Sequence, residues 1–81
     1  MPTIITVRGY RLFFWSNEGR PREPLHVHVQ KGGARAKVWL EPAVVIGEAY
    51  DFNSGELREI EEIVAEHVEL IRSRWDEHFS N

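Results

Sequence analysis

The stretch that decides the fold is Leu25-His26-Val27-His28-Val29-Gln30-Lys31-Gly32-Gly33-Ala34-Arg35-Ala36-Lys37-Val38-Trp39-Leu40. Apolar and polar residues alternate on both sides of the glycine pair, which is typical of two strands that each turn one face toward a core. A two-residue hairpin turn requires positive φ at its centre, and glycine adopts such values without steric cost. The stretch therefore predicts a β-hairpin with its turn at Gly32-Gly33.

This turn fixes which residues face each other across the hairpin. With the two glycines as the loop, Val27 pairs with Val38 and His28 pairs with Lys37. Because side chains alternate between the faces of a strand, one face carries the apolar residues Leu25, Val27, Val29, Ala36, Val38 and Leu40. The opposite face carries His26, His28, Gln30, Arg35, Lys37 and Trp39. We expect the apolar face to contact the core and both histidines to point away from it.

Weaker strand patterns flank the hairpin. Residues 4–15 are rich in β-branched and aromatic side chains and predict one long strand, or two short ones bent at Gly9. Phe13 and Trp15 share one side of this segment with Arg11, and the pattern allows that side to join either the core or the polar face. Residues 44–50 predict a further strand or extended segment. With the hairpin strands at about 25–30 and 35–40, the sequence predicts an antiparallel sheet of three to four strands.

The last third of the chain has a helical period. At about 100° per residue, the segment from about 54 to 79 gathers one apolar stripe, made of Leu57, Ile60, Val64, Val68, Ile71, Trp75 and Phe79. The opposite side carries Glu59, Glu62, Glu66, Glu69 and Glu77. Asn53 with Glu56, or Ser54 alone, can cap the start. We predict one long C-terminal helix packed on one face of the sheet with Trp75 buried, and thus a single α+β domain over residues 1–81.

The composition narrows the function classes. The chain has 81 residues and no cysteine, which excludes disulfides, thiolate catalysis and cysteine-ligated metal sites. No apolar run approaches the roughly 18 residues of a membrane span and no leader pattern is visible, so we expect a cytoplasmic protein without a membrane partner. Residues 1–40 carry seven basic and two acidic side chains, a net charge of +5, whereas residues 41–81 carry three basic and eleven acidic ones, a net charge of −8. A basic half suits phosphates and an acidic half suits a basic partner, although the two halves can equally neutralise each other in the fold.

The polar face of the hairpin is suited to several kinds of contact. With RNA, Arg35 and Lys37 would hold phosphate, Trp39 would stack on a base, and His26 and His28 would serve as acid/base or phosphate-contacting groups. Two histidines at i and i+2 could instead share a metal ion, and tryptophan and arginine could anchor a protein interface. An antiparallel sheet also normally shows one polar face to water, so the pattern is equally compatible with no ligand.

The remaining histidines argue against a metal site. His67 and His78 are eleven residues apart, which is about 16 Å along a helix axis, so they cannot share an ion on one continuous helix. The helix stripe also faces the side of the sheet opposite to His26 and His28. We therefore expect neither a metal site nor a cofactor.

Four motifs follow one another through nearly the whole chain: Arg8-Gly9-Tyr10-Arg11-Leu12-Phe13-Phe14-Trp15-Ser16-Asn17, Glu23-Pro24-Leu25-His26-Val27-His28-Val29, Ala36-Lys37-Val38-Trp39-Leu40 with Pro42, and Trp75-Asp76-Glu77-His78-Phe79. In this the sequence resembles a family of small bacterial proteins, domain-of-unknown-function family 4160. That family usually has two prolines before its His-x-His and often a tyrosine before the final Phe, where this chain has Leu25 and His78. The resemblance implies a short stand-alone protein, often encoded beside a second small protein in pairs proposed as toxin–antitoxin modules, and it implies no established reaction.

Two functional hypotheses follow from the residues and the resemblance. In the first, the protein is a toxin–antitoxin component that acts on or binds RNA through His26, His28, Arg35, Lys37 and Trp39. In the second, it is a non-enzymatic protein-binding or regulatory module that pairs with the neighbouring small protein. The sequence leaves open whether the protein is an enzyme, and a second copy of the chain is a further candidate partner.

Overall fold

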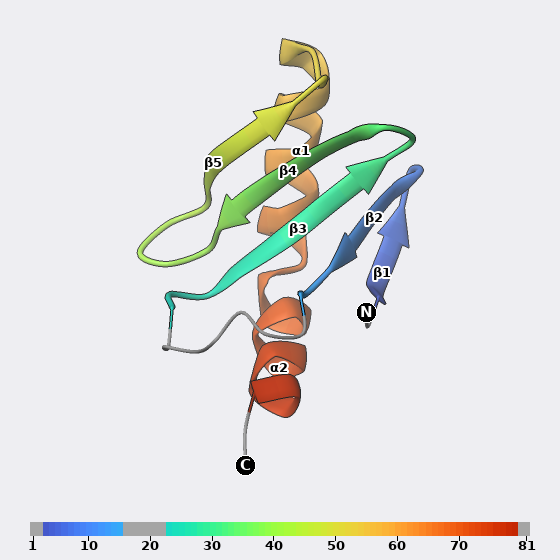
Figure 1. The fold of residues 1–81 in the computed structure, drawn as a ribbon. Helices are drawn as coiled ribbons and strands as arrows, with labels where there is room; N and C mark the ends of the chain where they lie inside the picture. The colour runs from blue at the N-terminus through green and yellow to red at the C-terminus, as the bar shows by residue number, and fades with distance from the viewer. Residues whose placement is uncertain (1–2, 16–22, 80–81) are drawn as a thin grey trace.

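A computed structural model describes residues 3–15 and 23–79 of the chain. Five strands form one antiparallel sheet in the order β1-β2-β3-β4-β5, and two helices follow them (Figure 1). The elements are β1 (Thr3–Val7), β2 (Tyr10–Phe13), β3 (His26–Lys31), β4 (Ala34–Trp39), β5 (Val45–Tyr50), α1 (Ser54–Glu66) and α2 (Val68–Phe79). The α+β class is confirmed, whereas the sheet has five strands rather than three to four and the helical region has two segments rather than one.

The β3–β4 hairpin has the predicted register. His28 pairs with Lys37, Val27 with Val38, and His26 with Trp39. Gly32 has a φ of 59°, the left-handed conformation that the turn requires. The residues expected on the core face are all buried, namely Leu25, Val27, Val29, Ala36, Val38 and Leu40.

The predicted long strand at residues 4–15 is in fact two strands joined by a tight turn. Val7 pairs with Tyr10, so Arg8 and Gly9 alone form the loop, and both have positive φ values of 54° and 84°. Such values at both central positions give the turn a twist that matches the flanking strands. The alternative in which the segment bends at Gly9 is therefore correct, and it adds the fifth strand.

Strand β5 contains a bulge at Gly47. The register with β4 steps from Lys37–Glu48 to Val38–Ile46, which leaves Gly47 without a partner in the ladder. The extra residue keeps Val45 and Glu48 on one face of the sheet although they are three positions apart. The indole of Trp39, on β4, fills the space beside Gly47, because an added Cβ there would lie 2.5 Å from Nε1 of Trp39.

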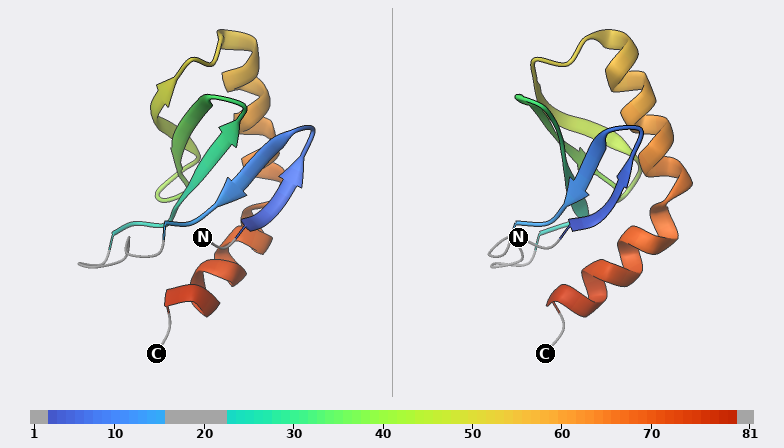
Figure 2. Two further views of the ribbon diagram at one scale, coloured as in Figure 1. Left: turned by 45° about the vertical axis from the view of Figure 1, so that its right-hand side comes forward. Right: turned by 90° about the vertical axis from the view of Figure 1, so that its right-hand side faces the viewer.

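Both helices lie on the same side of the sheet (Figures 1 and 2). The predicted stripe is confirmed as part of the core, since its members are buried or packed against buried residues. Ile63 is fully buried as well, and the stripe did not include it. The start of α1 is a capping box in which the Glu56 N–H donates to Asn53 Oδ1 at 2.8 Å and the Asn53 N–H donates to Glu56 Oε1 at 3.0 Å. Neither helix is long and apolar enough to cross a membrane.

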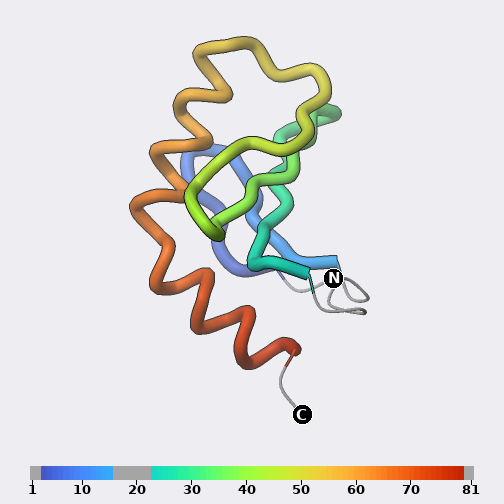
Figure 3. Tube along the Cα trace, turned by 90° about the vertical axis from the view of Figure 1, so that its left-hand side faces the viewer, coloured from blue at the N-terminus to red at the C-terminus, as the bar shows by residue number. Residues whose placement is uncertain are grey.

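The prediction of one continuous helix is wrong because the helix breaks at His67 (Figure 3). Nδ1 of His67 lies 2.7 Å from the carbonyl oxygen of Ile63, the acceptor that a regular helix offers to the backbone N–H of His67. That N–H instead donates to the carbonyl of Val64 at 3.1 Å. A side chain that enters the helical hydrogen-bond ladder is a recognised cause of kinks. Beyond the break α2 takes a new direction and turns under the end of the sheet (Figure 2).

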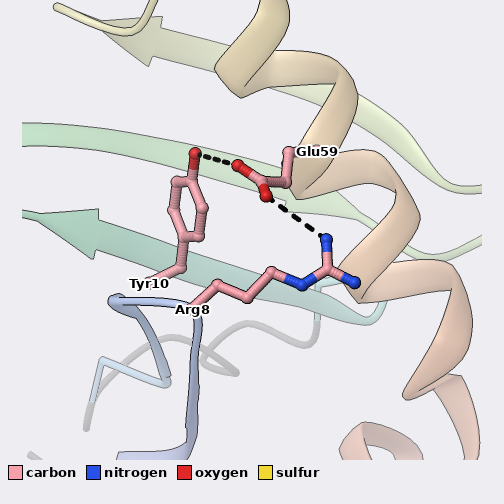
Figure 4. Close-up of polar contacts among 3 residues, drawn as sticks. All are labelled: Arg8, Tyr10 and Glu59. Carbon is pink, nitrogen blue, oxygen red and sulfur yellow. Dashed lines mark hydrogen bonds and ion pairs between the residues drawn. The ribbon is translucent and has the colours of Figure 1, made fainter.

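A polar cluster fastens α1 to the β1–β2 turn (Figure 4). The Tyr10 hydroxyl donates to Oε1 of Glu59 at 2.8 Å, and Nη1 of Arg8 lies 3.2 Å from Oε2 of the same carboxylate. The expectation that Glu59 faces away from the sheet is therefore wrong. Burial, with the hydrogen bond to Glu59 as a second cause, raises the pKa of Tyr10 to about 12. The hydrogen bonds from Tyr10 and then Arg8 lower the pKa of Glu59.

We expect Tyr10→Phe to make the free energy of unfolding less sensitive to alkaline pH. Tyr10 keeps its proton to about pH 12 in the folded protein but loses it near pH 10.0 when unfolded, so its contribution is complete below pH 10.0 and is lost as the pH rises to about 12. In urea unfolding at neutral pH the variant should be less stable by about 1 to 2 kcal/mol. The difference from the parent protein should shrink above pH 10.0, and a difference that grows there would contradict the assignment.

Candidate functional site

The sheet face opposite the helices is called the open face below (Figure 1). Three rows of side chains cross the strands on this face. Backbone pairing defines them as Arg11–Gln30–Arg35–Tyr50, Phe13–His28–Lys37–Glu48 and His26–Trp39–Val45. Trp15 lies two residues beyond the end of β2 and adds its ring to the middle row through contacts with Phe13 and His28. The undecided side of the first predicted strand therefore belongs to the open face, not to the helix-covered core.

His28 is at the centre of a cluster of rings on the open face. Its imidazole stacks on Phe13 with a centroid separation of 5.7 Å and an interplanar angle of 28°. The indole of Trp15 meets the same imidazole edge to face at 5.7 Å, and Trp15 itself is 44% exposed. The cluster thus presents aromatic surface that a planar ligand can reach.

Each described cation of the open face lies over an aromatic ring. The guanidinium of Arg11 is 4.3 Å from the ring centre of Phe13, and that of Arg35 is 5.4 Å from the ring centre of Tyr50. Nζ of Lys37 is 4.3 Å from the ring centre of Trp39. Lys37 also forms a 3.5 Å ion pair with Glu23, but both side chains are partly exposed, so this pair is weak. Positive charge and aromatic surface are therefore offered together.

A pocket of about 230 Å³ opens on this face beside His28. Its polar lining consists of His28, Arg35, Lys37 and Glu48, and its aromatic lining of Phe13, Trp15 and Tyr50. The volume is below the 300 Å³ or so at which pockets for drug-sized ligands begin. The pocket therefore suits a single small planar group that also carries negative charge.

His26 does not line this pocket, which corrects the expectation that both histidines point outward. The two imidazoles are neighbours, with centroids 5.4 Å apart, but His26 is only 1% exposed. Its ring lies 5.2 Å from that of Trp39 and 5.3 Å from that of Trp75 on α2. Nδ1 is 3.0 Å from the carbonyl oxygen of Pro24, which can only accept, so Nδ1 carries the proton and donates it. The turn of α2 under the end of the sheet covers this histidine.

Trp39 borders the pocket without lining it. Its indole lies against Gly47 and beside Lys37, and it forms one wall of a second hollow of about 340 Å³ at the end of the sheet. The structure therefore brings His28, Arg35 and Lys37 together in one pocket, with Trp39 next to it. In the described part of the chain, no group of three or more His, Asp or Glu side chains could hold a metal ion.

Sequence reasoning missed Glu48 and Tyr50 as lining residues of the pocket. They pair with Lys37 and Arg35, respectively, across the β4–β5 ladder. The bulge at Gly47 breaks the alternation of this segment, so the pattern alone does not assign the two residues to a face. The signal in the sequence was Gly47, because an isolated glycine within a strand often marks a bulge. With a bulge placed there, Glu48 and Tyr50 would have been assigned to the open face.

Charge is divided between the two sides of the molecule. The three rows of the open face carry the cations Arg11, Arg35 and Lys37 and the carboxylate Glu48, and a second carboxylate, that of Glu23, lies against Lys37. The helices expose six acidic residues, which are Glu61, Glu62, Glu66, Glu69, Asp76 and Glu77. An ion pair between Arg8 and Glu59 joins the basic and acidic halves of the sequence. The charge asymmetry of the sequence therefore persists in space instead of being fully neutralised.

These features define a small α+β protein with helices on one side of a single antiparallel sheet and a basic, aromatic pocket on the other. The chain belongs to the family described as domain of unknown function (DUF4160), whose model matches residues 9–76. The matched range contains the whole of β3 and β4, and with them every residue of the predicted site. Comparison with curated proteins and with solved structures finds no match.

Proposed function

We propose that this protein binds single-stranded RNA through its open face, with one base and its phosphate held in the pocket beside His28. The observation that carries the proposal is the lining of that pocket, where Trp15 and Tyr50 supply aromatic surface and Arg35 and Lys37 supply positive charge. Proteins recognise single-stranded RNA by stacking splayed bases on aromatic rings and by holding the backbone with cations.

The exposure of large apolar side chains supports this proposal. Among the described residues these are Trp15, Val45 and Tyr50, which are 44% to 53% exposed, and all three lie on the open face. Apolar groups gathered on one exposed face are typical of a contact surface. Their combination with cations favours a ligand that is both planar and anionic.

The burial of His26 leads us to propose binding and not cleavage. RNA cleavage by acid–base catalysis needs one group that takes the proton of the 2′-hydroxyl and another that protonates the leaving oxygen. The two histidines expected to share this work differ in access, since His28 lines the pocket and His26 is covered by α2. In this proposal His28 contacts the bound nucleotide directly, whereas His26 packs against the ring of Trp39 and helps to hold it in place.

Binding of fluorescein-labelled decauridylate, measured by fluorescence anisotropy at about 50 and 200 mM salt, tests the proposal. We expect Lys37→Gln to weaken binding and to reduce the slope of log Kd against log salt by about 0.7, the value for one lost phosphate contact on a single strand. The matched control is Arg58→Gln, because Arg58 is an exposed cation on α1, on the other side of the molecule. It should leave both quantities unchanged.

Two results would contradict the proposal. One is the absence of binding at the lower salt concentration, where phosphate contacts are strongest. The other is an equal loss of affinity in Lys37→Gln and Arg58→Gln, which would show that binding depends on overall charge and not on the pocket.

A further inference from the structure

The second hollow, at the end of the sheet, is mainly apolar, and the contact between Lys37 and Trp39 links it to the pocket. It is lined by Pro24, Trp39, Glu41, Pro42, Ala43 and Val45, and Val45 is 52% exposed. The one carboxylate in this lining, that of Glu41, accepts a 2.7 Å hydrogen bond from Arg72 at Oε2. That ion pair gives the carboxylate a positive neighbour, so it opposes an anionic ligand less than an isolated acid would.

Lys37 stands between the pocket and the hollow. It lines the pocket beside His28, and its Nζ lies 4.3 Å from the ring centre of Trp39, which lines the hollow. Lys37 and Trp39 are two positions apart on β4, so their Cα atoms are roughly 7 Å apart on the same face. One positive charge between two sites for planar groups matches one phosphate between two bases.

The indole of Trp39 is held in place before any ligand arrives. Gly47 leaves room for the ring on one side, and His26 meets it at 5.2 Å on another. His26 is itself fixed by the Pro24 carbonyl and by Trp75. A ring that is already ordered loses little conformational freedom on binding, which makes it a good stacking platform.

We propose that the open face binds two consecutive nucleotides of single-stranded RNA, with the first base in the pocket beside His28, the linking phosphate at Lys37 and the second base stacked on Trp39 in the apolar hollow. This inference rests on the proposed function, because it uses the same pocket and the same cation. It adds a second subsite and assigns Trp39 and Val45 to it.

Titrations of uridine 3′-monophosphate and of the dinucleotide UpU, which carry one phosphate each, test this arrangement when followed by NMR. We expect UpU to bind the parent protein roughly 5- to 150-fold more tightly than the monophosphate, which is the range for one stacked base. Trp39→Leu should remove most of that gain, measured as the ratio of the two affinities, because the ratio cancels any effect on the phosphate site at Lys37, whose Nζ lies over the same ring. Because Trp39→Leu could also loosen the fold, Val45→Glu serves as a second variant at an exposed edge position.

Thr6→Glu is the matched control for Val45→Glu, since Thr6 is exposed on β1 at the opposite edge of the sheet and the variant adds the same charge. It should keep the full gain of UpU over the monophosphate. If UpU binds no more tightly than the monophosphate, or if the variants weaken both equally, the second subsite is wrong while the proposed function stands. If neither of these ligands nor decauridylate binds, the proposed function fails and this inference fails with it.

Discussion

Trp75→Ala is expected to lower the free energy of unfolding by about 3 to 5 kcal/mol, the range for removing a large aromatic side chain from a core. Trp75 is where α2 and the end of the sheet meet. Its indole lies 4.3 Å from the ring of Phe79, 5.4 Å from that of Phe14 and 5.3 Å from that of His26. Alanine would leave all three rings without their common neighbour.

Thermal unfolding measures this effect. At about 4 to 8 °C per kcal/mol for a domain of this size, Tm should fall by about 12 °C or more. Arg74→Ala provides the control, because Arg74 is the exposed neighbour of Trp75 in α2 and its loss should change Tm little. A Tm shift of only about a degree or two for Trp75→Ala would show that α2 contributes far less to the core than its contacts indicate.

His26→Ala is expected to lower the free energy of unfolding by about 2 to 4 kcal/mol, through the cavity that it leaves and the loss of the hydrogen bond to Pro24. Its ring lies between those of Trp39 and Trp75, so the substitution removes packing contacts with both the sheet and α2. His28→Ala, at a partly exposed position, should cost much less stability and should instead weaken RNA binding.

The comparison of the two histidine variants separates a structural role from a functional one. Urea unfolding and decauridylate binding would be measured on each protein. An unchanged stability of His26→Ala together with a complete loss of RNA binding would contradict the structural role of His26. That result would favour the expectation from the sequence that both imidazoles contact the RNA.

The hairpin could be predicted in detail because its determinants are local. The glycine pair sets the turn, and the alternation around it leaves one register in which Val27 and Val38 share the core face. The burial of His26 could not be predicted in the same way. It depends on the direction of α2, which a contact between the His67 imidazole and the Ile63 carbonyl sets, and hydrophobic periodicity carries no information about such a contact.

The candidate site was accessible to sequence reasoning only in part. His28, Arg35 and Lys37 come together as the hairpin register implies, because all three positions depend on one turn. Tyr50 escaped prediction because the bulge at Gly47 shifts the alternation of its strand. The toxin–antitoxin role and the cognate protein partner stay predictions from the family resemblance.

The separation of charge has a consequence for how a polyanion can approach a protein whose net charge is −3. At physiological ionic strength the Debye length is about 8 Å, whereas the molecule measures at least 20 Å along each principal axis. Mobile ions therefore shield a phosphate near the sheet from the carboxylates on the far side. An incoming RNA strand therefore responds mainly to the charges of the open face itself, where Arg11, Arg35 and Lys37 outnumber the carboxylates of Glu23 and Glu48 by one.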